Sequence, residues 1–259
     1  LFPYTTLFRS PFYRQMETPL EAGQYANLAA LRWLGVTHLV YHIYIGTATV
    51  RFLSYGAPDL DTGKVDGLRR IYQSPRSMGG PYESPYDYTF ADLHEITAAP
   101  CTVALVFDAS PPFDRAEGWT GDDGMLPYGM FSALMDTSRT FSYPVWNGSS
   151  TERIMRDAGR ITAVHLSDKP VNFDLSFIAR AGDARDIEVR WNGAPVAKAA
   201  IGPELSTCAA SGFSLPAGGT GEISLVASGT PYHYMFSVGK DQIPVPALAA
   251  VSDVRAMVK

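Results

Sequence analysis

The 259-residue sequence lacks any run of 18 apolar residues, so no segment of it is predicted to cross a bilayer as a helix. It also lacks a cluster of basic residues. The 21 Lys and Arg against 26 Asp and Glu give a net charge of -5, which leaves no electrostatic footprint for nucleic acid or for an anionic membrane surface. With 18% charged and 46% hydrophobic residues, the composition is that of a folded chain with a sizeable core.

Cysteine is scarce, and the two that are present, Cys101 and Cys208, are too few and too far apart for a zinc site. A disulfide between them stays open if the chain faces an oxidising compartment. Two small thiols, buried or half-exposed, are the favoured interpretation.

Several catalytic motifs are missing. No G-x-S-x-G is present, which excludes a hydrolase built on a nucleophile elbow. No G-x-G-x-x-G opens a helix and no Walker loop occurs, so dinucleotide and nucleotide binding by these motifs have no support. The glycine-rich GGTGE lies between predicted strands and is more simply a hairpin turn.

The first ten residues, LFPYTTLFRS, show neither helical nor strand periodicity and no signal-peptide pattern. A reverse translation of all ten resembles a common sequencing-library adapter. We therefore interpret residues 1–10 as a non-native scar and exclude them from fold reasoning. Natural sequence is then expected to start near Pro11, which makes the chain a fragment whose N-terminal remainder is missing.

Residues 11–100 predict a small α/β domain. Thr18 and Glu21 can form a capping box at the start of an amphipathic helix, and Gly35 follows its last turn. The next ten residues, VTHLVYHIYI, are apolar on both faces, as in a buried strand. LRRIYQS and YTFADLHEI predict two further strands.

Residues 101–259 predict a β-sandwich domain of the jelly-roll kind, so the fold class is mainly β with a small α/β unit. CTVALVFDA reads as a buried strand, and VNFDLSFIA alternates apolar and polar residues with period two. Asn192-Gly193 is a strong hairpin signal, and Trp191 just before it is in phase with apolar core positions. YHYMFSVG and ALAAVSDVRAMV are expected to supply the last sandwich strands.

Metal and ligand candidates are few. His38 and His42 lie four apart on a predicted strand, where they would be about 13 Å apart and too distant to share an ion, so structural roles are favoured. The acidic segment FDRAEGWTGDDG, with Asp122 and Asp123, is a possible Ca²⁺ site, although a solvated loop is the favoured interpretation. No other cofactor is expected.

Two tryptophans in loop-like stretches, Trp119 and Trp146, are candidate sugar-binding platforms, because the C–H face of a pyranose packs on an aromatic ring. Together with Asp122 and Asp123 they form the predicted ligand site. Aromatic side chains also fill cores, so a core role for both tryptophans stays open.

LRWLGVTHLVYH, GLRRIYQS and YTFADLHEI together resemble the extracytoplasmic tail of bacterial polytopic membrane glycosyltransferases of the GT-C type and of YfhO-like proteins. RDIEVRWNGAPVAKA, FSLPAGGTGEISLVAS and ALAAVSDVRAMV resemble the galactose-binding-like sandwich that often follows. The resemblance implies a parent enzyme that transfers sugar from a polyprenyl-phosphate donor. Its catalytic acidic residue would lie among transmembrane helices that this chain does not contain, so no catalytic residue is assigned.

The resemblance therefore implies a non-catalytic, extracytoplasmic part of a membrane glycosyltransferase, tethered to the cytoplasmic membrane by its own transmembrane domain. It would cover the active-site face or hold acceptor glycan. A carbohydrate-binding module of a secreted glycan-processing enzyme is the alternative, and a purely structural cell-surface domain is a third possibility.

Overall fold

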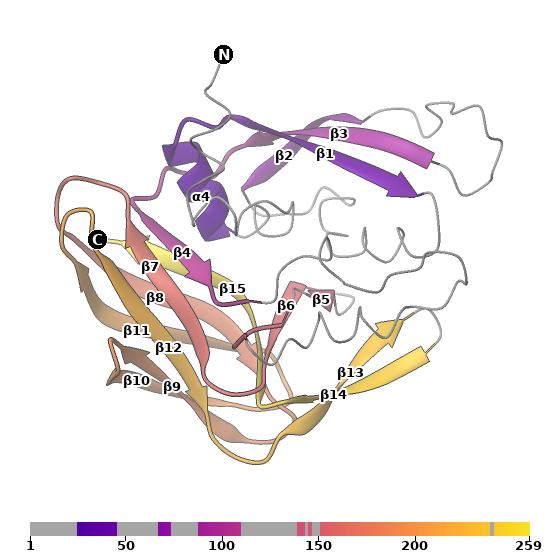
Figure 1. Ribbon diagram of the computed structural model, residues 1–259, viewed down its shortest axis with the longest axis vertical. Helices are drawn as coiled ribbons and strands as arrows, with labels where there is room; N and C mark the ends of the chain where they lie inside the picture. Colours follow the sequence, from indigo (N-terminus) through magenta and orange to yellow (C-terminus); the bar gives the residue numbers. More distant parts are fainter. Residues whose placement is uncertain are drawn as a thin grey trace.

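The computed structural model describes residues 25–45, 67–73, 88–109, 139–142, 145–146, 151–238 and 241–259 (Figure 1). The predicted capping box at Thr18 and Glu21, and residues 1–10, lie outside these ranges. Among the described residues, no helix combines the length and apolar character that a membrane crossing requires.

The described helix, α4 (Tyr25–Trp33), ends as the sequence predicts. Gly35 has φ 88°, a left-handed conformation that glycine adopts without a steric penalty. The Val36 N–H donates to the Leu31 carbonyl at 2.9 Å, and the Gly35 N–H donates to the Arg32 carbonyl at 3.1 Å. This pair of bonds is a Schellman motif, and it turns the chain directly from the helix into the first strand.

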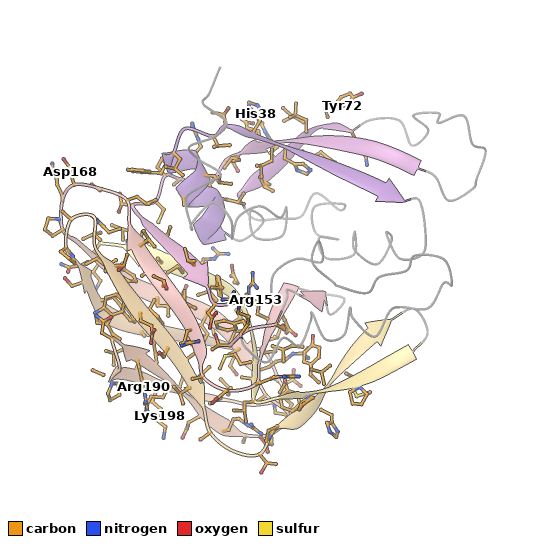
Figure 2. All side chains as sticks on the ribbon, in the orientation of Figure 1. His38, Tyr72, Arg153, Asp168, Arg190 and Lys198 are labelled. Atoms are coloured by element: carbon orange, nitrogen blue, oxygen red, sulfur yellow. The ribbon has the colours of Figure 1, made fainter. Side chains whose placement is uncertain are left out.

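That strand, β1 (His38–Ile45), belongs to an antiparallel sheet with β2 (Leu68–Gln73) and β3 (Tyr88–Ile96). The order is β1-β3-β2, so all three strands predicted between residues 36 and 96 are present. His38 and Tyr72 lie on the side of this sheet that faces away from the sandwich (Figure 2). Helix α4 packs instead against two strands of the sandwich, β4 (Val103–Phe107) and β15 (Ala249–Val258).

Two five-stranded antiparallel sheets form the sandwich. The chain crosses repeatedly from one sheet to the other, which is jelly-roll connectivity. The first sheet runs in the order β10 (Ala194–Ile201), β9 (Arg185–Trp191), β12 (Thr220–Ala227), β7 (Gly159–His165), β4 (Val103–Phe107). The second runs β11 (Ser206–Leu215), β8 (Val171–Arg180), β15 (Ala249–Val258), β6 (Thr151–Met155), β5 (Val145–Trp146).

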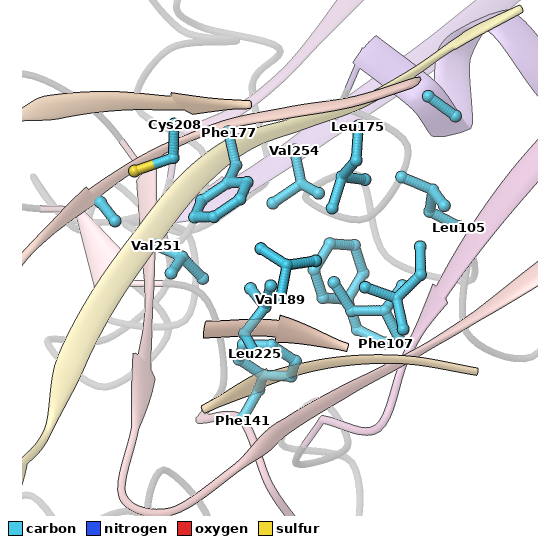
Figure 3. Close-up of a cluster of buried hydrophobic side chains, with 14 of the residues drawn as sticks. Leu105, Phe107, Phe141, Leu175, Phe177, Val189, Cys208, Leu225, Val251 and Val254 are labelled. Carbon is cyan, nitrogen blue, oxygen red and sulfur yellow. The ribbon is translucent and has the colours of Figure 1, made fainter. Parts of the chain in front are cut away.

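The core lies between these sheets (Figure 3). In β8 every second residue is buried, as the period-two pattern predicts. Its Phe173 meets Trp191 of the opposite sheet edge-on, with ring centroids 5.9 Å apart, and Trp191 also meets Phe213 at 5.4 Å. Each such pair contributes about 0.5–1.5 kcal/mol beyond the burial of apolar area. The predicted fold class, mainly β with a C-terminal β-sandwich, is confirmed.

The Asn192-Gly193 turn joins β9 and β10 with positive φ at both residues, 49° and 84°. This is the backbone of a type I′ hairpin turn, which matches the twist of the flanking strands. The sequence signal at this position is therefore confirmed.

Both cysteines are free and buried, so the disulfide alternative is excluded and the interpretation as two buried thiols is confirmed. Burial raises the pKa of Cys101 and of Cys208 above the ordinary thiol value. Both cysteines belong to the hydrophobic core.

One expectation is wrong. YHYMFSVG was expected to finish the sandwich, but β13 (Tyr232–Val238) pairs instead with β14 (Asp241–Ala247) in a two-stranded sheet of its own. Pro244 and Pro246 of β14 lie opposite Met235 and His233. Proline cannot donate a ladder hydrogen bond, so it suits a strand with a neighbour on one side only. The last sandwich strand is β15, as ALAAVSDVRAMV predicts.

Candidate functional site

The structure places one of the four predicted ligand residues. Trp119, Asp122 and Asp123 lie outside the described residues and stay predictions. Trp146 ends the edge strand β5, where its backbone pairs with Thr151 of β6. His38 and His42 share strand β1, as expected. In the described ranges, no three His, Cys, Asp or Glu side chains gather in a way that could hold a metal ion.

Beside Trp146 in the sheet, β6 carries a buried carboxylate. Glu152 is 1% exposed, and its Oε2 accepts a hydrogen bond from Arg180 Nη2 at 2.7 Å. The Tyr234 hydroxyl donates to the same oxygen at 2.9 Å. The Arg180 guanidinium also lies over the Tyr234 ring, 5.4 Å from its centroid. We call Glu152, Arg180 and Tyr234 the Glu152 cluster.

Strand register shows which face of the sandwich carries the cluster. Ala250 of β15 pairs with Ile154 on one side and with Arg180 on the other, so these residues share a face. Glu152 is two residues before Ile154 and lies on that same, outer face. Its carboxylate is therefore covered from outside the sandwich, where hairpin β13–β14 contributes Tyr234.

The neighbouring residue has the opposite orientation. Arg153 pairs with Val251 and points between the sheets, where it is 2% exposed (Figure 2). Its guanidinium lies 4.7 Å from the centroid of the Phe107 ring, and its Nη1 donates to the Ser142 carbonyl at 3.3 Å. Arg153 thus links the two sheets at this edge, which supports a fixed backbone under Glu152.

Burial and the neighbouring charges shift the pKa values of the side chains in and beside the cluster. Burial lowers the pKa of Arg180, but the hydrogen bond and charge of Glu152 outweigh it and raise the pKa overall. Burial, followed by the nearby Glu152 charge, raises the pKa of Tyr234 well above its ordinary value. Burial also raises the pKa of Tyr232 to about 12. Both tyrosines therefore keep their protons at neutral pH.

Two buried polar atoms of the cluster make no hydrogen bond within the part of the chain that the structure describes: Glu152 Oε1 and Arg180 Nε. One is an acceptor and the other a donor, and each belongs to a side chain that is already fixed by an ion pair. A buried polar group without a partner costs about 1–3 kcal/mol, so such atoms are rare in native proteins and call for an explanation. Together they complement a hydroxyl, which both donates and accepts.

Arg185 fixes the base of hairpin β13–β14. Its Nη1 donates to the Leu248 carbonyl at 3.2 Å and its Nη2 to the Thr230 carbonyl at 2.9 Å, so one side chain holds both ends of the hairpin. Asp183 accepts a bond from Arg185 Nε at 2.6 Å. Tyr232 packs on Gly182, where an added Cβ would lie 2.5 Å from the Tyr232 Cβ.

A second polar cluster has a structural role. Asp108 accepts from Arg139 at 3.1 Å and from Arg160 at 2.8 Å, and Thr140 donates to it at 3.1 Å. Burial raises the pKa of Asp108, but the hydrogen bonds from the two arginines outweigh it and hold the pKa below its ordinary value. Every carboxylate oxygen of Asp108 is used, so the cluster pins residues 139–142 to the end of β4.

Sequence reasoning missed the Glu152 cluster. Glu152 and Arg180 are 28 residues apart, and Glu152 and Tyr234 are 82 residues apart. No spacing rule joins residues at such separations, because the juxtaposition depends on the order of strands in the sheet. The available local signal is Glu-Arg inside the short apolar-flanked strand TERIM, and charged residues at such positions are common.

No family model and no curated protein matches the chain. Among solved structures, it is similar to a family two carbohydrate esterase from Clostridium thermocellum in complex with cellohexaose (12% identity, 46% of this chain, TM-score 0.26). The match spans 31% of the esterase chain. It is also similar to the module CsCBM6-3 from Clostridium stercorarium in complex with cellobiose (14% identity, 43% of this chain, 79% of that chain, TM-score 0.27).

A family 35 carbohydrate-binding module from Clostridium thermocellum shows 15% identity over 40% of this chain and 78% of that one, with a TM-score of 0.23. At these identities and TM-scores the similarities assign no function. The description of the fold rests on the strand order of this chain itself.

Proposed function

We propose that this chain is a non-catalytic, extracytoplasmic portion of a bacterial membrane glycosyltransferase, in which it holds acceptor glycan or covers the active-site face. The sequence resemblance carries the membrane part of this proposal. Its partners would be a transmembrane domain of the same protein and, through that domain, a polyprenyl-linked sugar. The chain would lie on the periplasmic or extracellular side of the cytoplasmic membrane.

The observation that supports glycan binding is the Glu152 cluster beside edge strand β5. A carboxylate and a guanidinium with unused hydrogen-bonding atoms suit hydroxyl groups, and tyrosine rings suit the C–H faces of a sugar. Trp146 lies on the strand next to Glu152, since Val145 is the direct partner of Glu152. Trp146 and Glu152 therefore lie on neighbouring strands at one edge of the second sheet, with Trp146 opposite Thr151 in the register.

The test is a glycan array followed by titration calorimetry with the purified 259-residue protein. We expect binding of at least one oligosaccharide class, and weaker binding of that class by Trp146→Ala and Trp119→Ala. A wild-type protein that binds no glycan on the array would overturn the glycan-binding role. A loss of binding in EDTA that added Ca²⁺ restores, and that Asp122→Asn with Asp123→Asn reproduces, would support the predicted Ca²⁺ site in the acidic segment.

The same cluster also suits a carbohydrate-binding module of a secreted glycan-processing enzyme, because hydroxyl recognition does not depend on a membrane anchor. The coding sequence upstream of Pro11 distinguishes the two candidates. Many transmembrane helices upstream support the glycosyltransferase, whereas a signal peptide and a hydrolase domain support the secreted enzyme.

A further inference from the structure

We propose that Glu152 and Arg180 form a binding subsite for two adjacent hydroxyls of a sugar ring, and that hairpin β13–β14 is a hinged cover over that subsite. The inference rests on the proposed glycan-binding function and deepens it. It assigns the contact atoms, the chemical class of ligand group and the element that must move.

The contact atoms are the two that the protein leaves unused. One ligand hydroxyl donates its proton to Glu152 Oε1, and its neighbour accepts the N–H of Arg180 Nε. The ion pair through Oε2 and Nη2 holds both side chains, so little side-chain ordering remains for binding. Hydrogen bonds to charged groups are stronger than neutral ones, which favours this pair over a surface serine or asparagine.

The surroundings also suit a sugar. The Tyr234 ring stacks on the Arg180 guanidinium, and Tyr232 lies half-buried next along the same face of β13. Both phenols stay protonated, since burial raises the pKa of each. Both phenols are therefore neutral, so Glu152 and Arg180 supply the charged contacts of this subsite.

The hairpin is a separate structural unit. It forms its own two-stranded sheet and does not continue either sandwich sheet. Its two ends are held together by Arg185 through Thr230 and Leu248. The Tyr234 hydroxyl is bonded to Glu152, which closes the hairpin over the carboxylate. In the proposed cover, Arg185 holds the base and the Tyr234 bond to Glu152 is the latch that must open.

The latch competes with the ligand. A hydroxyl that approaches Glu152 from outside the sandwich must pass the Tyr234 hydroxyl, which already donates to Oε2. Removing this one oxygen frees an acceptor lone pair and releases the hairpin without changing the size of the ring. Tyr234→Phe is therefore expected to open the cover and to strengthen binding several-fold, the opposite of what loss of a ligand contact would do.

The test uses the oligosaccharides that bind the wild-type protein on the array, each paired with its per-O-methylated derivative, which has no hydroxyl donors. Glu152→Gln keeps the shape but loses the charge, and we expect at least tenfold weaker binding. Glu188→Gln is the matched control, because Glu188 pairs with Arg190 on the outer face of the other sheet. Circular dichroism and a thermal melt verify that each variant is folded.

The outcomes separate the two proposals. A wild-type protein that binds no glycan overturns the proposed function. Glycan binding that is equal in Glu152→Gln and Glu188→Gln, or equal for methylated and free glycans, overturns the subsite alone. Hydrogen exchange over residues 232–247 tests the cover, and unchanged exchange in Tyr234→Phe overturns it. If Glu152→Gln does not fold, the comparison of free and methylated glycans still tests the subsite, and hydrogen exchange in Tyr234→Phe still tests the cover.

Discussion

Gly221→Ala tests the packing between the two sheets. An alanine Cβ at this position would lie 2.0 Å from Trp191 Cη2 and 2.5 Å from Trp191 Cζ2. Ordinary carbon contacts are about 3.5–4.0 Å, so the indole must retreat by roughly 1.5–2 Å. The ring cannot do so and keep its edge-on contacts with Phe173 and Phe213. Losing two aromatic pairs at about 0.5–1.5 kcal/mol each, with about 1–3 kcal/mol for the strain of overpacking, gives a loss of about 2–6 kcal/mol.

The measurement is urea unfolding followed by far-ultraviolet circular dichroism, with a thermal melt in which we expect a midpoint lower by on the order of 10 °C. Gly202→Ala is the control, because an added Cβ there meets nothing within 4 Å. In a Trp191→Ala background the cost of Gly221→Ala is expected to vanish, because the clashing ring is absent. A Gly221→Ala variant as stable as Gly202→Ala would refute the packing argument.

Three further predictions concern stability and reactivity. Asp108→Asn is expected to lower the free energy of unfolding by about 1–2 kcal/mol at neutral pH, measured by urea unfolding. The fold lowers the pKa of Asp108, so its stabilising contribution is present above the ordinary pKa of 3.8 and is lost as the pH falls through the folded value. The stabilities of wild type and variant should therefore converge in acid. Cys101 and Cys208 are expected to react with a disulfide reagent at least about tenfold more slowly in the native protein than in urea, and equal rates would contradict their burial. Gly193→Ala, at φ 84°, is expected to cost about 1–2 kcal/mol relative to Gly202→Ala, and equal stability would argue against the I′ turn.

The elements with a local signal could be predicted from the sequence. The alternation in VNFDLSFIA predicts β8, and the buried residues follow it. Asn192-Gly193 predicts the β9–β10 hairpin, and Gly35 predicts the end of α4. In each case the pattern depends on backbone geometry within a few residues, which the sequence determines directly.

Elements that depend on distant partners could not be predicted in the same way. Strand β14 contains Pro244 and Pro246, and proline is a signal against a strand unless the strand lies at an edge. Whether β13 joins the sandwich or leaves it depends on which strand occupies the position beside β15, and β6 and β8 occupy both of its sides. No pattern within YHYMFSVG indicates whether this strand joins the sandwich.

The candidate site illustrates the same limit. Trp119 and Trp146 are predicted as sugar-binding residues because both lie in loop-like stretches, where an aromatic ring can be exposed to a sugar. The residues that the structure brings together are Glu152, Arg180 and Tyr234, which come from β6, β8 and β13. Their chemistry follows from strand order and from the fold of the hairpin onto the sheet.

The bracing of both hairpin ends by Arg185 has a consequence for the design of variants. Thr230 and Leu248 are held close together by one guanidinium, so the residues between them behave as an exchangeable cassette. Both five-stranded sheets are complete without β13 and β14. Hairpins of other lengths can therefore be grafted between Thr230 and Leu248 if Tyr234, Val245 and Ala247, which pack against the sandwich core, are retained.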